Sequence, residues 1–595
     1  MSRRTRAAVV AGLATLALLC PTACTSGGGE GASPSPSPDA LADAPFRDPA
    51  MPVAERVDDL LARMDLADKV GQMTQAPRDG LSPAQVTALR LGSVLSGGGS
   101  APDDNTPAGW ADMVDGYQRA AAATPLGIPL LYGVDATHGH QLLYGATIFP
   151  QNIGLGAAGD PELARETARA TAEELVATGV NWTFAPCVAV VQDTRWGRSY
   201  ESFGSEPAAV AAMTTMVNGF QDAGVLATAK HFVADGGTAG GVDQGDARIT
   251  EAELRAVHLP PYEAAVADGV GSVMLSFSSW NGQKVHGDRD LVTGALKDEL
   301  GFDGFVVTDW AGIDQLDGET DFTRAEIVEA IDAGVDMAMV PHDVQRFVDE
   351  LTAAVEAGEI PQERIDDAVR RILTVKVRMG LFEAGPVDRS LADQVGSAEH
   401  RALARRAVAA SQVVLANDGV LPLAADARVL VTGSNADDIG NQAGGWTLTW
   451  QGASGDTIPG TTILEGLRAA LGDDAVTFSA DGSGAAGHDV AIAVVGETPY
   501  AEFEGDRPDG VHLTPADEAV LARLRESGVP TVLVVVSGRP VDIAEPLTWV
   551  DAAVAAWLPG SEGAGVADVL TGSVAPGGHL PVSWGDFPVG FGLTY

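Results

Sequence analysis

Gly304-Phe305-Val306-Val307-Thr308-Asp309-Trp310 is the stretch around which the rest of the chain is best understood. Its apolar run, with two β-branched valines, predicts a short strand buried on both faces. Asp309 follows directly, and a carboxylate at the end of a buried strand is costly unless something pairs with it or uses it. In a β/α barrel that end faces the active site. The stretch alone leaves a catalytic and a structural Asp309 both open.

The same kind of short apolar run alternates with helical patterns over residues 45–381. This alternation favours a parallel sheet with crossover helices, and seven or eight such units predict a TIM-like (β/α)8 barrel. The predicted strands are 92–95, 129–134, 182–191, 227–233, 272–277, 305–308 and 335–340. The predicted helices include 161–178, 251–268 and 324–333, and a helix at 361–379 closes this part.

A second alternating series follows a predicted linker at 382–398 and occupies residues 399–595. Its predicted strands are 413–416, 429–432, 476–479, 490–495, 531–536 and 553–557. Strands at this spacing predict an open doubly wound sheet in an α/β sandwich domain. The fold class is therefore α/β, with a barrel followed by a sandwich.

The chain is strongly acidic, with 37 Lys and Arg against 81 Asp and Glu in 595 residues and a formal net charge of −44. Such a field repels nucleic acid and anionic membrane surfaces, so we expect neither as a partner. A hydrophobic fraction of 45% is enough for large cores.

Residues 1–24 have the features of a signal peptide, with a basic start and an apolar stretch too short for a membrane span. Cys24 follows a small residue, as in the lipobox of bacterial lipoproteins, although Pro21 departs from that pattern. A lipid-anchored Cys24 on the extracellular side and simple secretion are the two alternatives. Residues 25–44 predict a Gly/Ser/Pro tether without a fold of its own.

The other cysteines predict little chemistry. We expect Cys20 to be removed with the signal segment, and the remaining thiols form neither a disulfide framework nor a zinc-binding pattern. We expect Cys187 to be a buried apolar filler, and we predict no cofactor and no metal ion.

Polar and aromatic side chains follow one predicted strand after another in the first part. Convergence of many strand ends on one barrel face favours a site, and carboxylates, cations and indoles suit a sugar. The residues concerned are Asp135, His138, His140, Asp193, Arg195, Trp196, Arg198, Lys230, His231, Asp235, Ser276, Ser278, Ser279 and Trp280.

Several motifs in this order resemble glycoside hydrolase family 3, specifically its two-domain β-glucosidases and exo-β-glucan glucohydrolases, over about residues 45–595. In the first part they are Tyr132-Gly133-Val134-Asp135, Asp193-Thr194-Arg195-Trp196-Gly197-Arg198, Lys230-His231-Phe232, Met274-Leu275-Ser276-Phe277 and Val307-Thr308-Asp309-Trp310. In the second part they are Gly444-Gly445-Trp446, Trp450-Gln451-Gly452, Val495-Gly496-Glu497, Tyr500-Ala501-Glu502 and Ser537-Gly538-Arg539-Pro540.

The resemblance implies a retaining, exo-acting hydrolase of β-glucosides and β-glucans. Asp309 would be the nucleophile, and Glu502 would be the general acid/base supplied by the second domain. Trp310 and Trp450 would clamp the second sugar. The remaining substrate-binding residues would be Asp135, Arg195, Lys230, His231 and Met274.

Some positions leave the assignment open in detail. Phe277 and Gln315 stand where the plant-type glucan enzymes have Tyr and Arg, so close equivalence of the subsites is not implied. Glu497 and Glu504 lie in the same short loop as Glu502 and are alternative acids.

The alternative functions come from the same family and from outside it. A β-xylosidase is the first alternative within the family, whereas the loop after Lys230-His231 lacks the pattern of its β-N-acetylglucosaminidases. A non-catalytic sugar-binding lipoprotein would be expected to lack one carboxylate, and both Asp309 and Glu502 are present. Linkage preference and oligomeric state stay open.

Overall fold

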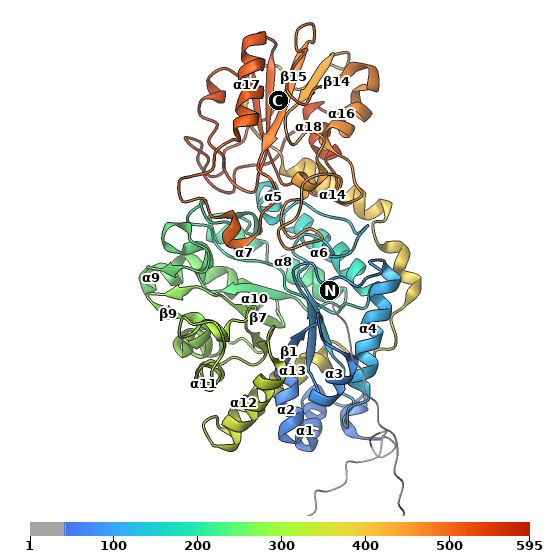
Figure 1. Ribbon diagram of the computed structural model, residues 1–595, viewed down its shortest axis with the longest axis vertical. Helices are drawn as coiled ribbons and strands as arrows, with labels where there is room; N and C mark the ends of the chain where they lie inside the picture. Colours follow the sequence, from blue (N-terminus) through green and yellow to red (C-terminus); the bar gives the residue numbers. More distant parts are fainter. Residues whose placement is uncertain (1–40, 42) are drawn as a thin grey trace, which may run out of the picture.

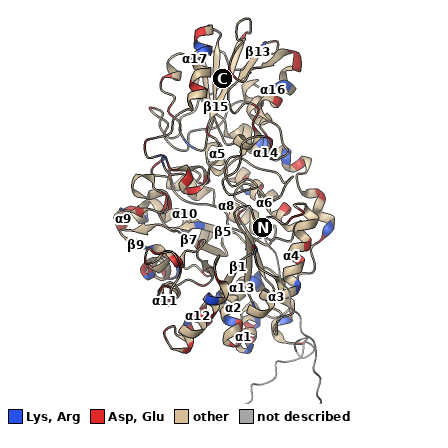
Figure 2. Ribbon diagram, viewed as in Figure 1, with Lys and Arg blue, Asp and Glu red and all other residues tan. Residues whose placement is uncertain are grey.

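The computed structural model describes residue 41 and residues 43–595, which form two parts stacked along the long axis (Figure 1). The predicted signal segment with Cys24, and most of the predicted tether 25–44, lie outside the described residues. Within the described part of the chain, no helix combines the length and the hydropathy needed to cross a bilayer. Figure 2 shows charged residues on many of the helices that cover the outside of the molecule.

The first part contains two fully parallel sheets, with strand orders β11-β1-β2-β3-β4 and β10-β7-β5. Isolated parallel bridges pair Trp182 with Leu226 and Val307 with Met337, so the outer strands of each sheet are bonded to the other sheet. The strands are β1 (Thr74–Pro77), β2 (Ser93–Ser96), β3 (Leu131–Val134), β4 (Trp182–Thr183), β5 (Thr228–Phe232), β7 (Ser272–Leu275), β10 (Phe305–Val307) and β11 (Ala338–Met339). A small separate sheet comprises β6 (Asp246–Ala247), β8 (Ser279–Trp280) and β9 (Gln283–Lys284).

The helices of the first part are mostly short and well capped. Helix α11 has the bounds predicted from sequence, because Thr323 forms a capping box with Glu326 and the chain leaves the helix at Gly334. The helices are α1 (Val53–Arg63), α2 (Leu66–Gln72), α3 (Pro83–Leu89), α4 (Pro107–Ala122), α5 (Asn152–Ala158), α6 (Pro161–Val176), α7 (Pro207–Ala212), α8 (Thr215–Asp222), α9 (Glu251–Glu253), α10 (Pro260–Ala267), α11 (Arg324–Ala333), α12 (Val344–Glu356) and α13 (Gln362–Arg378).

Two sequence predictions for this part are wrong in detail, and one strand was missed. The strand predicted at 182–191 ends at Thr183, and the chain continues as a loop through Pro186, which has no N–H to donate to a ladder. The helix predicted at 251–268 is divided into α9, a π-helical turn at Leu254–His258 and α10, which begins at two consecutive prolines. Strand β1 was not predicted, because its sequence Thr-Gln-Ala-Pro contains no apolar run.

The second part is built on a six-stranded sheet of order β12-β17-β16-β15-β13-β14. All six predicted strands are present, and every pair is parallel except the antiparallel pair of β12 and β17 at one edge. The strands are β12 (Val413–Asn417), β13 (Val429–Thr432), β14 (Val476–Phe478), β15 (Val490–Gly496), β16 (Thr531–Val536) and β17 (Ala552–Trp557). The helices are α14 (Ala398–Ser411), α15 (Ile439–Ala443), α16 (Ile463–Leu471), α17 (Pro515–Ser527) and α18 (Ala564–Leu570), with α17 and α16 on opposite sides of the strands in Figure 1.

Each part has a hydrophobic core, and the two cores meet where the parts touch. The second core includes Trp196 and Tyr200, which belong to the loop after β4 of the first part. The hydroxyl of Tyr200 donates a 2.7 Å hydrogen bond to the backbone carbonyl of Tyr500. This packing holds the carboxyl end of β15 over the carboxyl ends of the strands in the first part.

Candidate active site

A cavity of about 470 Å³ lies between the carboxyl ends of the first part's strands and loops of the second part. It brings together most of the residues predicted from sequence. From the first part these are Asp135, Lys230, His231, Met274, Asp309 and Trp310, and from the second part Trp450 and Glu502.

The carboxylate of Asp309 lies just beyond the end of β10, with its side chain 13% exposed. Its Oδ1 accepts a 2.7 Å hydrogen bond from the backbone N–H of Trp310. Its Oδ2 has no hydrogen-bond partner among the described residues and lies 3.6 Å from Nε2 of His231. Burial raises the pKa of Asp309 to about 6, although the nearby Arg198 cation opposes the shift. A carboxylate with one free oxygen, ionised above that pH, can attack an electrophilic carbon.

Glu502 enters the cavity from the second part, with its side chain 14% exposed. It begins the 3₁₀ turn Glu502–Gly505, and its backbone is in the left-handed region at φ 54°. Burial raises the pKa of Glu502 to about 8, the Arg198 cation opposes this, and the charge of Asp309 adds to it. A carboxyl group that keeps its proton at neutral pH can act as a general acid.

The neighbouring glutamates in this loop do not reach the cavity. Glu497 accepts hydrogen bonds from the Tyr500 hydroxyl at 2.9 Å and from the Arg539 guanidinium at 3.1 Å. Glu504 is exposed to solvent. Of the three candidate acids, only Glu502 faces Asp309.

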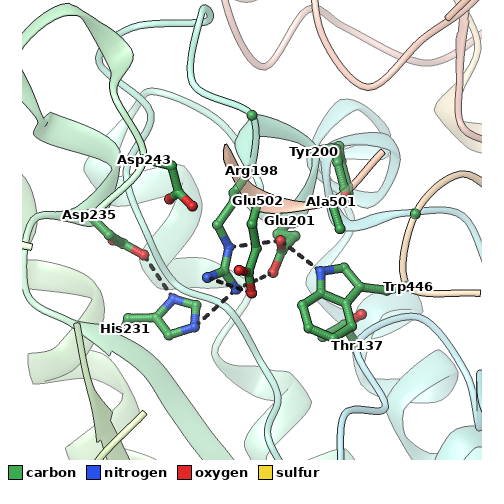
Figure 3. Close-up of polar contacts among 12 residues, drawn as sticks. Thr137, Arg198, Tyr200, Glu201, His231, Asp235, Asp243, Trp446, Ala501 and Glu502 are labelled. Atoms are coloured by element: carbon green, nitrogen blue, oxygen red, sulfur yellow. Dashed lines mark hydrogen bonds and ion pairs between the residues drawn. The ribbon is translucent and has the colours of Figure 1, made fainter. Parts of the chain in front are cut away.

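Arg198 lies between Glu502, Glu201 and His231 (Figure 3). Its Nη1 lies 3.6 Å from Oε1 of Glu502, and its Nη2 donates to Nε2 of His231 at 3.1 Å. Both Nε and Nη2 also donate to Glu201 at 2.9 Å, and Glu201 accepts a further bond from Trp446 Nε1 at 3.1 Å. Burial raises the pKa of Glu201, but the Arg198 cation overcomes it and holds that pKa below its usual range. The Arg198 guanidinium thus places a positive charge near both Asp309 and Glu502.

The motif at residues 193–198 contains two arginines, and sequence reasoning selected Arg195 as the substrate-binding one. In the structure, Arg198 lines the cavity and Arg195 does not. Arg195 turns away from the cavity and pairs with Asp193 at 2.5 Å, with its side chain 43% exposed. The available signal for Arg198 was the opposite charge of Glu201 three residues later, which suits a local ion pair.

The polar floor of the cavity consists of His231, Lys230 and Asp135. Because a guanidinium can only donate, His231 Nε2 is the acceptor from Arg198, and Nδ1 carries the hydrogen that is donated to Asp235 at 2.9 Å. Burial and the Arg198 cation lower the pKa of His231 well below its ordinary value, so its ring is neutral at pH 7. Lys230 Nζ donates to Asp135 at 3.0 Å. The floor therefore offers a neutral imidazole, an ammonium group and a carboxylate, which can donate hydrogen bonds to sugar hydroxyls or accept them.

Aromatic rings form the opposite, solvent-facing side of the cavity. Trp310 is 40% exposed and Phe503 48% exposed, and the rings of Trp450 and Phe503 meet edge to face at 5.6 Å. Phe503 was not predicted from sequence. The two positions that depart from the plant-type pattern, Phe277 and Gln315, also line the cavity.

One group of potential metal ligands lies beneath the cavity. The ligand atoms of Cys187, His231 and Asp235 lie within 4.8 Å of one another. Burial raises the pKa of the Cys187 thiol, whereas a metal-binding cysteine must be deprotonated. His231 and Asp235 already bond to each other, so this group is better explained as internal packing of the His231 ring.

Comparisons with known proteins agree with this geometry. The models of the glycosyl hydrolase family 3 N-terminal domain and C-terminal domain match residues 65–375 and 412–587. A lysosomal beta glucosidase of Dictyostelium discoideum is 34% identical over 91% of this chain and 73% of its own length. A periplasmic beta-glucosidase of Salmonella typhimurium is 30% identical over 90% of this chain and 75% of its own length. The crystal structure of an exo-1,3/1,4-beta-glucanase from a Pseudoalteromonas species superposes with a TM-score of 0.87 at 42% identity, over 92% of this chain and 75% of that one.

Proposed function

The chain belongs to glycosyl hydrolase family 3, and from that premise we propose that it is a retaining, exo-acting β-glucosidase with Asp309 as nucleophile and Glu502 as acid/base. One observation carries the proposal. Two largely buried carboxyl groups from different domains face one cavity, with pKa values raised to about 6 for Asp309 and about 8 for Glu502. At a pH between these values one is ionised and the other protonated, which is the arrangement that retaining hydrolysis requires.

In the first step, Oδ2 of Asp309 bonds to the anomeric carbon as the bond from that carbon to the glycosidic oxygen breaks. The proton of Glu502 passes to the departing oxygen. In the second step, the Glu502 carboxylate takes a proton from water, the water oxygen bonds to the anomeric carbon, and Asp309 leaves. Two inversions restore the β configuration.

The distribution of exposure supports release of single glucose units from the non-reducing end. Lys230 and His231 are each 2% exposed, whereas Trp310 and Phe503 are 40% and 48% exposed. We propose that the terminal glucose binds the polar buried floor through Asp135, Lys230 and His231. The next sugar would stack between the aromatic rings at the open end.

We also propose that the two sheets of the first part form one closed (β/α)8 barrel over residues 45–381. The parallel bridges from Trp182 to Leu226 and from Val307 to Met337 support closure. A linker at 382–398 and an α/β sandwich at 399–595 would complete the catalytic unit. Export through residues 1–24, with or without acylation of Cys24, stays a proposal that mass spectrometry of the mature N-terminus tests.

Trapping tests the nucleophile directly. A 2-deoxy-2-fluoro β-glucoside with a good leaving group should inactivate the enzyme and add one sugar to the peptide that contains Asp309. Labelling of another carboxylate would overturn the assignment. Nuclear magnetic resonance of the first product should show the β anomer, and a panel of aryl β-glucosides and β-xylosides decides between glucosidase and xylosidase.

A further inference from the structure

The loop that carries Glu502, here residues 497–508, is docked onto the first part by the carboxylate of Asp506. Oδ1 of Asp506 accepts from the backbone N–H of Gly197 at 2.9 Å, and Oδ2 accepts from the backbone N–H of Asp243 at 2.9 Å. The two donors belong to two different loops of the first part. One side chain therefore joins the Glu502 loop to both loops by charge-assisted hydrogen bonds.

Arg539 provides a second anchor from the same side. Its Nη1 donates to the carbonyls of Arg195 at 3.0 Å and Trp196 at 3.1 Å, and its Nη2 donates to the carbonyl of Gly505. Glu497 accepts from the same guanidinium at 3.1 Å and holds it in place. The backbone on both sides of the interface is thus tied to one rigid cation.

The docked backbones leave no spare room. A Cβ placed on Gly197 would lie 2.0 Å from the carbonyl oxygen of Glu502, so only glycine permits this approach. Glu502 itself adopts φ 54°, which a residue with a side chain keeps only where its surroundings hold it there. The conformation of Glu502 therefore depends on the contacts of its loop.

We propose that Asp506 is a positioning residue for the acid/base Glu502, holding that carboxyl group against the nucleophile across the domain interface. The inference rests on the proposed role of Glu502. Asp506 does not line the cavity, so it acts on catalysis through the geometry of the loop alone. A displacement of about 1 Å in a catalytic group can lower a rate by about 100-fold.

The proposal predicts a selective loss of activity in Asp506→Ala. Alkyl β-glucosides and β-linked glucose disaccharides need protonation of the leaving oxygen, so their kcat/KM should fall by about 100-fold. A dinitrophenyl β-glucoside needs little protonation, so its kcat/KM should fall by less than about 5-fold. Equal losses on both substrate types, or no loss on either, would overturn the proposal.

Asp551→Ala is the matched control. Asp551 also accepts from a backbone N–H, that of Thr531 at 2.8 Å, but it directly precedes β17 and lies beside the amino end of β16, opposite the end that faces the cavity. Its removal should lower thermal stability, and any change in kcat/KM should be the same for the two substrate types. If Asp506→Ala does not fold, Asp506→Asn decides. It keeps one acceptor oxygen and should show a smaller loss, about 10-fold, with the same selectivity.

A double-mutant cycle separates this inference from the proposed function. Glu502→Ala alone should show the selective loss, and its absence would reject Glu502 as the acid. Given that loss, adding Asp506→Ala to Glu502→Ala should slow disaccharide hydrolysis no further, because the group that Asp506 positions is already gone. Additive losses would show that Asp506 acts by another route and would overturn the inference.

Discussion

Asp309 and Glu502 face the same cavity and are almost equally exposed, yet the fold supports them in different ways. Asp309 follows β10, which is paired with β7 and bridged to Met337, so the hydrogen bonds of the sheets fix the strand that leads directly into it. Glu502 lies in a loop whose position depends on side chains that cross the domain interface. A catalytic group on a strand is positioned by many backbone bonds, whereas one on a loop depends on a few replaceable contacts.

The largest expected effect is that of Asp309→Ala, because Asp309 is the proposed nucleophile of the covalent step. We expect kcat to fall by about 10⁴-fold or more for every glucoside, whatever its leaving group. Circular dichroism should show an intact fold, since the side chain contributes no sheet hydrogen bond. A variant that loses activity only on disaccharides would contradict the role.

Glu502→Ala should have the second largest effect, and a selective one. Disaccharide hydrolysis should fall by about 10³-fold, while cleavage of a dinitrophenyl glucoside to the covalent intermediate should survive. Glu497→Ala and Glu504→Ala are the controls. If the selective loss appeared in Glu504→Ala and not in Glu502→Ala, the general acid would be Glu504.

Azide sharpens the comparison between the two carboxylates. Azide needs no base, so with Glu502→Ala it should attack the covalent intermediate and yield β-glucosyl azide after two inversions. With Asp309→Ala, azide should displace the leaving group directly and yield the α product after one inversion. The same anomer from both variants would show that the two groups do not act on opposite faces of the sugar.

His231→Ala should have a smaller effect that is the same for all leaving groups. The neutral ring lies 3.6 Å from Asp309 Oδ2 and is proposed to bind the terminal sugar, so we expect kcat/KM to fall by about 30-fold. Steady-state kinetics with matched aryl and alkyl glucosides measures this. Activity equal to wild type would reject the model of the inner subsite, and selective loss on alkyl glucosides would indicate proton transfer by His231.

The smallest expected change is in the shape of the pH profile. For wild type, kcat/KM should fall below about pH 6 as Asp309 gains a proton, and above about pH 8 as Glu502 loses its proton. Glu502→Gln keeps a neutral side chain at all pH values. Measured on an aryl glucoside whose leaving group still needs protonation, this variant should lose the alkaline limb and keep the acid limb. Loss of the acid limb in its place would reverse the two roles.

Much of this architecture could be predicted from local patterns. The run at Phe305–Val307 predicts β10 and places Asp309 at its end, because burial on both faces demands continuous apolar residues. The same reasoning found all six strands of the second part and the loop of Glu502. It missed β1, where pairing with neighbouring strands and not the local sequence stabilises the extended backbone, and it extended β4 to residue 191, whereas that strand ends at Thr183.

For some polar side chains, only the folded chain shows which of them reach the cavity. Arg195 and Arg198 lie in one motif, but the choice between them depends on where Glu201 and the loop of Glu502 are placed in space. Asp506 and Gly197 are 309 positions apart, and no local pattern encodes their contact. Strands follow from the chemistry of consecutive residues, whereas the direction of a loop side chain follows from partners that folding alone brings near.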